Sequence, residues 1–216
     1  MWVVLFIFLT TYNYDIGKNQ INSFFSIKKI EISGIEFTKK KDLEDKFNSL
    51  KNKNLILIKK SDFVEITKEF QFIEELKIKK IYPNKIKVTI NEFMPIAYFI
   101  DNKKKYVLTN GEKKIINYDK KKIGNLPLVV GRSAAKKFSI FYSVLKANNF
   151  NVELIKQFNY FDINRWDIIL KDDKVIKLPS EDYERSIVKF LSIYGKGNFK
   201  DFKVFDFRVD NQLILK

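Results

Sequence analysis

The sequence predicts an α+β protein with a short apolar N-terminal segment followed by two globular domains. Between residues 24 and 92, two helical patterns lie between segments in which apolar and polar residues alternate, as they do along half-buried strands. Between residues 93 and 216, alternating segments dominate and helical patterns are few. We therefore expect a small β-α-α-β-β domain over residues 24–92 and a mainly antiparallel β-domain with two or so helices over residues 93–216.

The chain begins with a wholly apolar run, residues 1–9, that is too short to span a bilayer by itself. A spanning helix needs roughly 17–25 residues. The run also lacks the basic start and the small residues before a cleavage point that mark a secretory signal. One interpretation is a buried strand or helix. We favour part of a membrane anchor over residues 1–14, with residues 24–216 outside the cytoplasm.

The first domain is expected to contain three strands and two helices. Alternation around residues 30–32 predicts the first strand, and alternation on both sides of Pro83-Asn84 predicts a hairpin. Thr38 and Ser61 are the expected N-caps of the two helices. The apolar positions of these helices are Leu43, Phe47 and Leu50 in the first, and Phe63, Ile66 and Phe70 in the second.

The second domain is expected to consist mostly of hairpins. Asn110-Gly111 predicts a type I′ turn, whereas residues 126–131, "LPLVVG", indicate a loop. Trp166 is expected to be a core residue, and Ser180 is the expected N-cap of a helix. Strands are expected at residues 96–100, 106–109, 157–163, 166–171 and 174–178, and helical stripes at residues 138–145 and 183–194.

The chain ends in an alternating pattern, "VFDFRVDNQLILK" (residues 204–216), which we interpret as one strand with a bulge near Asn211. Asp206 and Arg208 form either a local ion pair or a charged contact for a partner. The last four residues carry one charge, so the outer edge is weakly protected against pairing with another chain. If the Gln212 N–H faces a partner, proline at that position should weaken binding. The expected core anchors are Phe205, Phe207, Val209, Leu213 and Leu215. The expected partner-binding residues are Arg208, Val209, Asp210, Asn211, Gln212, Leu213, Ile214, Leu215 and Lys216.

The composition argues against catalysis and against nucleic-acid binding. The 216 residues include no cysteine and no histidine, which removes thiol nucleophiles, the commonest general base and the commonest metal ligand. The net charge of +15 comes almost entirely from lysine, which is spread over every expected element rather than gathered in one patch. We predict no enzyme activity, no cofactor and no nucleic-acid partner. A polyanionic surface such as lipid headgroups is compatible with the charge.

The ordered motifs resemble the FtsQ/DivIB family of bacterial cell division proteins. "EISG" (residues 31–34) and "IYPNKIKVTINEFMPIA" (residues 81–97) are similar to a POTRA domain of the FtsQ type. "LTNGEKKI", "LPLVVG", "RWDIILKDDKVIKLP" and "FDFRV" resemble the FtsQ-type β-domain, with Asp173 where a glycine is usual. The resemblance covers about residues 24–216 and is of the alphaproteobacterial kind.

The resemblance implies a non-catalytic, single-pass scaffold in the inner membrane at the division septum, with its C-terminal domain in the periplasm. It implies that the POTRA domain helps recruitment and that the β-domain binds the FtsB–FtsL pair by β-augmentation at the C-terminal strand. The assembly would regulate septal peptidoglycan synthesis by FtsW and FtsI, with FtsK as a further partner. The alternative is a POTRA-bearing component of an outer-membrane protein assembly or translocation system, although such chains usually carry several POTRA units.

Overall fold

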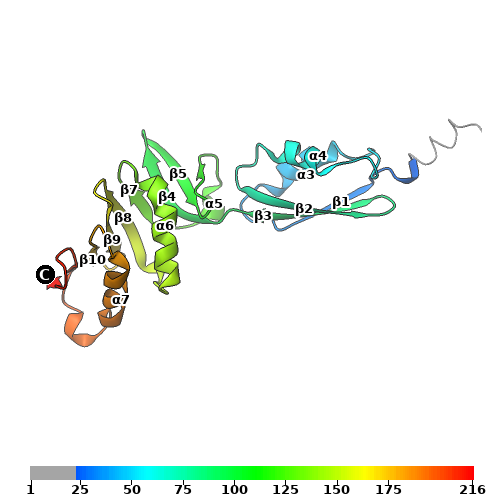
Figure 1. Ribbon diagram of the computed structural model, residues 1–216. Helices are drawn as coiled ribbons and strands as arrows, with labels where there is room; N and C mark the ends of the chain where they lie inside the picture. The colour runs from blue at the N-terminus through cyan, green and yellow to red at the C-terminus, as the bar shows by residue number, and fades with distance from the viewer. Residues whose placement is uncertain (1–22) are drawn as a thin grey trace, which may run out of the picture. The chain divides into compact units, whose positions relative to one another are not determined.

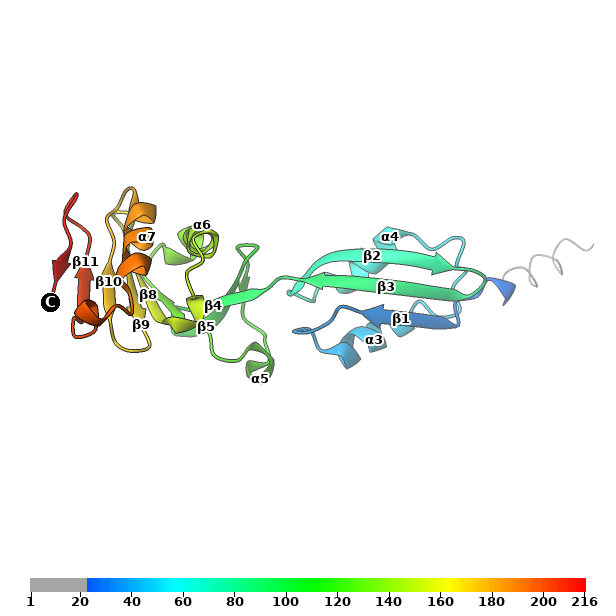
Figure 2. The ribbon, with the colours of Figure 1, turned by 90° about the horizontal axis from the view of Figure 1, so that it is seen from below.

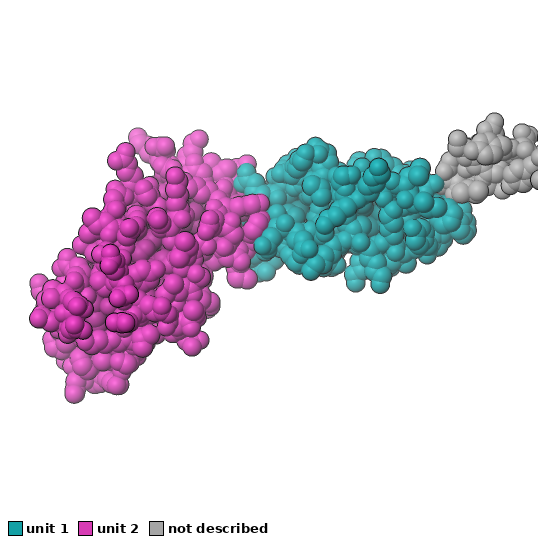
Figure 3. Space-filling view, in the orientation of Figure 1, with its two compact units in different colours: residues 1–92 teal, residues 93–216 magenta. Residues whose placement is uncertain are grey.

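The computed structural model describes residues 23–216, so the expected membrane anchor over residues 1–14 lies outside the described residues. The chain divides into two compact units that meet between Glu92 and Phe93 (Figure 3). Each unit has its own hydrophobic core. Within residues 23–216, we find no helix with the length and hydrophobicity that a membrane crossing requires.

Unit 1, the part up to Glu92, packs two helices on one face of a three-stranded sheet (Figures 1 and 2). The sheet order is β1-β3-β2, and β3 runs parallel to β1 and antiparallel to β2. The central strand contributes Ile86, Val88 and Ile90 to the core. The elements are β1 (Lys29–Ser33), α3 (Lys40–Asn48), α4 (Lys60–Thr67), β2 (Ile73–Ile81) and β3 (Lys85–Glu92). This is the β-α-α-β-β order that the sequence predicts.

The two helices of unit 1 do not begin at the N-caps that the sequence predicts. Lys39 rather than Thr38 precedes α3, and Lys59 rather than Ser61 precedes α4. At α4, the carboxylate of Asp62 reaches back and accepts the main-chain N–H of Lys59 at 2.8 Å. In a capping box, the side chain of the third helical residue accepts the main-chain N–H of the residue before the helix, and Asp62 makes this contact.

Glu92, the last residue of β3, holds the chain segment that leads into α3. Its carboxylate accepts the main-chain N–H groups of Glu36, Phe37 and Thr38 at 2.6, 2.7 and 2.8 Å. Hydrogen bonds to an ionised acceptor are among the strongest in proteins. One side chain distant in sequence therefore fixes the segment that precedes α3.

Unit 2, residues 93–216, is built on one nine-stranded sheet with the order β12-β11-β10-β9-β8-β7-β4-β5-β6. Five of its eight strand pairs are antiparallel and three are parallel, so the expected mainly antiparallel β-domain is confirmed. Its helices α6 and α7 share one hydrophobic core with the sheet (Figure 1). The elements are β4 (Pro95–Asp101), β5 (Lys104–Thr109), β6 (Lys114–Ile115), α5 (Lys120–Ile123), β7 (Leu128–Val130), α6 (Ala134–Ala147), η1 (Val152–Leu154), β8 (Ile155–Phe161), β9 (Arg165–Leu170), β10 (Val175–Lys177), α7 (Tyr183–Ile193), η2 (Gly197–Phe199), β11 (Val204–Asp206) and β12 (Ile214–Leu215).

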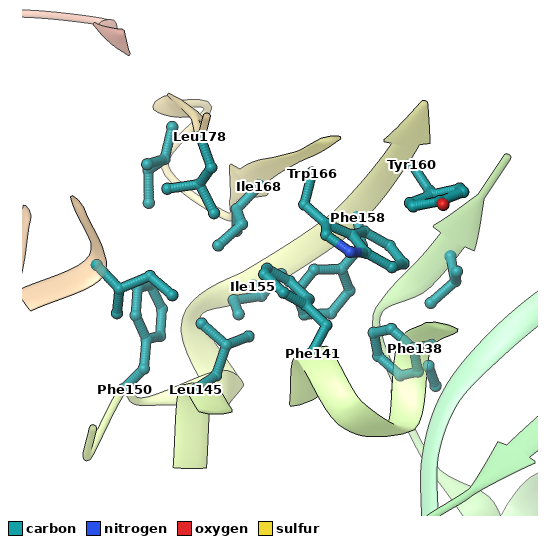
Figure 4. Close-up of a cluster of buried hydrophobic side chains, with 14 of the residues drawn as sticks. Phe138, Phe141, Leu145, Phe150, Ile155, Phe158, Tyr160, Trp166, Ile168 and Leu178 are labelled. Carbon is teal, nitrogen blue, oxygen red and sulfur yellow. The ribbon is translucent and has the colours of Figure 1, made fainter. Parts of the chain in front are cut away.

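An aromatic cluster fills the core between α6 and the central strands (Figure 4). Trp166 of β9 is 3% exposed, as expected, and stacks on Phe141 of α6 with ring centroids 4.6 Å apart. Phe138 and Phe158 pack edge to face beside this pair, with centroids 5.0 Å apart. Because side chains alternate along a strand, the neighbours of Trp166 on β9 project from the opposite face of the sheet.

Three local predictions for unit 2 are wrong. "LPLVVG" contains β7 rather than a loop, because a strand between two parallel neighbours is apolar on both faces and shows no alternation. Asn110-Gly111 does join two antiparallel strands, but the left-handed residue is Glu112, so the turn is not type I′. At α7, Asp182 occupies the position before the helix that was predicted for Ser180.

Replacing Glu92 by alanine should lower the stability of unit 1 by about 2–3 kcal/mol, because three main-chain N–H groups lose a charged acceptor. Hydrogen exchange of residues 29–92 measures this change separately from unit 2. Glu74→Ala on β2 is the matched control, since Glu74 is an exposed acid of the same unit. Equal exchange in the two variants would contradict the role assigned to Glu92.

Candidate functional site: the C-terminal edge of the large sheet

Residues 204–216 form a hairpin rather than the single strand that the sequence predicts. Strand β11 runs parallel to β10 on one side and antiparallel to β12 on the other. Phe205 lies opposite Leu215, and Asp206 lies opposite Ile214. The chain therefore folds back on itself, and β12 rather than β11 is the outermost strand of the sheet.

Short polar side chains produce this reversal. The Asp206 carboxylate accepts the main-chain N–H of Arg208 at 3.1 Å, just after β11 ends. Asn211 adopts a left-handed conformation with φ 56°, and the Gln212 N–H donates to the Val209 carbonyl at 3.2 Å. Such local hydrogen bonds compete with a strand ladder. The hypothesis that the Gln212 N–H faces a partner is wrong, because the turn already uses this donor.

The expected core anchors are confirmed except at the turn. Phe205 and Phe207 are buried, and Leu213 and Leu215 are half-buried against the same core. Val209 is 46% exposed, because the turn carries it away from the sheet. The alternation of apolar residues therefore identifies the two arms of the hairpin but not the turn between them.

The outer side of β12 carries main-chain groups that no strand within residues 23–216 pairs with. Lys216 and Val204 exchange two hydrogen bonds, of 3.2 Å and 3.0 Å, across the β11–β12 pair. In an antiparallel pair, alternate residues direct their N–H and C=O groups toward the neighbour. Ile214 and Lys216 therefore face β11, whereas Leu213 and Leu215 direct their main-chain groups outward.

Arg208 is bound to Asp206 within the chain. Its Nε and Nη2 donate to the two carboxylate oxygens of Asp206 at 2.8 and 2.6 Å. This bidentate contact holds the pKa of Asp206 below its ordinary value and raises the pKa of Arg208. Asp206 is 5% exposed, whereas the Arg208 side chain is 40% exposed. The local ion-pair interpretation is confirmed, and the Arg208 Nη1 takes no part in it.

A row of charged residues crosses the sheet beside this pair, on the face opposite Trp166. Asp167 of β9, Lys177 of β10 and Asp206 of β11 occupy matching register positions. Asp167 is 6% exposed, and burial raises its pKa although Arg165, Lys177 and Arg208 oppose the change. The Nε of Arg165 lies 3.4 Å from its Oδ1. The sequence pattern does not single out Asp167. Alternation places this residue on the face of β9 opposite Trp166, but it does not reveal that the side chain is buried on that face as well.

A groove of about 400 Å³ separates the hairpin turn from the start of α7. Residues 179–182, Arg185 and Lys189 line one side, and residues 207–212 line the other. The structure therefore divides the predicted binding residues into two groups. The first group lines the groove and consists of Arg208, Val209, Asp210, Asn211 and Gln212. The second group comprises β12 and the residue on either side of it, namely Leu213, Ile214, Leu215 and Lys216. Within residues 23–216, no cluster of acidic side chains is arranged to hold a metal ion.

Removing the charge of Asp206 and removing the charge of Asp167 should change the stability of the fold in opposite directions. The folded pKa of Asp206 lies below its ordinary value of 3.8. Its ionised form therefore stabilises the fold above that pH, and this contribution disappears as the pH falls through the folded pKa. At pH 7, Asp206→Asn should lower stability by about 1–2 kcal/mol because a charged hydrogen-bond acceptor is lost.

Asp167→Asn is the matched variant and should raise the melting temperature at pH 7, because ionisation of buried Asp167 costs stability. This difference should shrink as the pH falls and Asp167 becomes protonated. Thermal unfolding between pH 3 and pH 7 measures both variants. Destabilisation of equal size in the two variants would contradict the opposite pKa shifts.

Comparisons with known proteins agree with this architecture. Residues 25–93 match the model of the POTRA domain, FtsQ-type, and residues 97–208 match the model of Cell division protein FtsQ/DivIB, C-terminal. Among curated proteins named Cell division protein FtsQ, that of Rhizobium meliloti is 23% identical over 76% of this chain and 53% of its own length. That of Caulobacter vibrioides is 22% identical over 76% of this chain and 55% of its own length. That of Rickettsia typhi is 24% identical over 89% of this chain and 73% of its own length.

This chain spans about half the length of the first two of these relatives. The matches confirm the resemblance drawn from the motifs, and a family of non-catalytic division proteins agrees with the prediction that the chain is not an enzyme. The two family models follow each other in the order of the two units and together cover most of residues 23–216. The chain belongs to the FtsQ/DivIB family of cell division proteins.

Proposed function

We propose that this chain is a single-pass inner-membrane scaffold of the division machinery that binds the FtsB–FtsL pair through β12. In this role it links early and late division proteins, including FtsK, and regulates septal peptidoglycan synthesis by FtsW and FtsI. The POTRA domain, residues 24–92, and the β-domain, residues 93–216, both lie on the periplasmic side. The observation that carries the proposal is the open outer side of β12.

The outer side of β12 is suited to binding a strand from a partner. Main-chain hydrogen bonds provide affinity in β-augmentation, and the flanking side chains provide specificity. Leu215 and Leu213 supply the outward main-chain groups, while their half-buried side chains keep β12 attached to the core. Ile214, which is 39% exposed, adds an apolar contact surface. The edge is therefore held by the sheet and open to a partner at the same time.

The charge pattern favours β12 over the other outer strands of the two sheets. Proteins protect free edges with charged residues, especially lysine. The outer strands of unit 1 carry charges, Lys29 and Glu31 in β1 and Lys77, Lys79 and Lys80 in β2. The opposite outer strand of the large sheet, β6, begins with Lys114. In contrast, β12 consists of Ile214 and Leu215 and carries no charge within the strand.

Arg208 gives the edge an electrostatic selectivity. Its Nε and Nη2 bind Asp206, which fixes the plane of the guanidinium beside the groove. A partner carboxylate that approaches Nη1 would meet a cation whose position is already set, so less side-chain entropy is lost on binding. We propose that the partner strand is flanked by an acidic residue at this position.

Leu215→Pro should weaken binding of the FtsB–FtsL pair by at least about 1 kcal/mol, because it removes an outward N–H that a partner strand would use. Proline is tolerated on an edge strand when its nitrogen faces outward. Leu215→Ala is the matched control, since it also shortens the side chain but keeps the N–H. Titration of the purified pair onto each variant measures the difference. Equal affinities for the proline and alanine variants would contradict strand addition at β12.

Deleting residues 210–216 should abolish binding of the pair, because the outer strand and half of the groove are lost together. Hydrogen exchange of residues 29–92 should stay at the parent level, which separates loss of the site from general unfolding. A folded deletion variant that binds the pair with parent affinity would place the interface elsewhere.

The apolar run of residues 1–9 supports membrane attachment. Native protein should remain in the membrane fraction through alkaline carbonate extraction, and protease added to spheroplasts should digest residues 24–216. Release by carbonate, or protection of the C-terminal domain from protease, would contradict the proposed location.

A further inference from the structure

We infer that the end of unit 1 at which the described chain begins rests on anionic lipid headgroups of the membrane. This surface, here called the basal tip, consists of residues 23–28, 51–57 and 80–84. The inference rests on the proposed membrane attachment and goes beyond it, because an anchored domain need not contact the bilayer. It is carried by three observations: the hydrogen bonds that join the segments of the tip, its exposed apolar side chains and its charge.

Main-chain hydrogen bonds join the three segments of the basal tip. The Ile27 N–H donates to the Lys53 carbonyl at 3.0 Å, and the Asn52 N–H donates back to the Ile27 carbonyl at 3.1 Å. The Lys28 N–H donates to the Asn84 carbonyl at 2.8 Å, which connects the first segment to the β2–β3 turn. Figures 1 and 2 show this turn, the loop before α4 and the start of the described chain at the same end of the unit.

Large apolar and aromatic side chains are exposed on this firmly connected surface. Leu57 is 72% exposed, Phe24 is 61% exposed, Tyr82 is 58% exposed and Ile56 is 48% exposed. Phe25 bridges two of them, with its ring centroid 5.1 Å from that of Phe24 and 6.1 Å from that of Tyr82. Aromatic rings with adjacent aliphatic side chains are the residues that settle at the level of lipid headgroups.

The charge of the basal tip has a single sign. Its three segments read "SFFSIK", "KNKNLIL" and "KIYPN", and they contain four lysines and neither aspartate nor glutamate. Lys28, Lys51 and Lys53 are exposed, and the Nζ of Lys80 donates to the Ile56 carbonyl at 3.0 Å, which supports the exposed loop. Lysines near an anionic bilayer are attracted by its negative surface potential. Apolar side chains surrounded only by positive charge fit an anionic lipid surface better than a neutral protein face.

The sequence limits how far the basal tip can lie from the apolar run. Thirteen residues, 10–22, separate the end of that run from Ser23. Even a fully extended chain of this length reaches no more than about 50 Å. The basal tip is also the end of unit 1 that the chain enters directly from this segment. Contact between the tip and the bilayer therefore requires no rearrangement of unit 1.

Site-specific fluorescence of the full chain in vesicles tests the inference. The chain contains no cysteine, so Leu57→Cys can be labelled alone with bimane. Ile163→Cys is the matched control, because Ile163 is similarly exposed, at 65%, but belongs to unit 2. In vesicles of phosphatidylglycerol and phosphatidylcholine that include a nitroxide headgroup lipid, quenching at position 57 should exceed quenching at position 163 at least twofold. Phosphatidylcholine alone, or Lys51→Glu with Lys53→Glu, should reduce this excess.

Three outcomes would overturn the inference. The first is equal quenching at the two positions in a protein that stays in vesicles through alkaline extraction. This result would support the membrane anchor but contradict contact between the basal tip and lipid. A change in bimane emission that follows protein concentration without lipid would show that a second copy covers the tip. Equal quenching at position 57 with and without phosphatidylglycerol would show that the lysines of the tip do not bind anionic headgroups. Release of the protein by alkali would instead contradict the proposed function.

Discussion

An open β-sheet has two outer strands whose main-chain hydrogen bonds cannot all be made within the sheet, and unit 2 depends on how this constraint is met. Its nine strands do not close on themselves, so β6 and β12 each keep one side that no strand of residues 23–216 pairs with. Both strands are two residues long, but β6 begins with a lysine, whereas β12 is apolar and is attached through β11 to the centre of the sheet. The Asp206–Arg208 pair fixes where β11 ends and hence where β12 can start. The same local contacts that create the hairpin also create the candidate site.

Sequence periodicity predicts much of the architecture because several strands and helices bury one face and expose the other, as β3 does. The order of unit 1 and the helical stripe of α6 follow from apolar spacing. The core position of Trp166 follows from how deeply tryptophan usually buries. An ordered set of motifs also resembles the FtsQ/DivIB family, and the family models match the same parts of the chain. Periodicity fails at β7, where both faces of the strand carry apolar residues and the alternation disappears.

The candidate site is predicted only in part, for reasons that are also physical. The weakly charged end of the chain correctly indicates an open edge, but the hairpin depends on side-chain contacts at Asp206 and Asn211 that resemble a bulge in sequence. Glu92 and Asp167 are similar cases. The N–H groups that Glu92 binds lie more than fifty residues away in sequence, and burial of Asp167 depends on how neighbouring strands cover its face. Contacts between distant residues have no local pattern by which they can be recognised.

The central claim is that β12 accepts a partner strand, and amide hydrogen exchange resolved by residue tests it most directly. In the free protein, the Ile214 and Lys216 amides should exchange slowly because they face β11, whereas the Leu215 amide should exchange rapidly. Addition of the FtsB–FtsL pair should slow exchange at Leu215 and leave the already protected amides nearly unchanged. Rapid exchange at Leu215 in a complex that is shown to be fully formed would contradict the account.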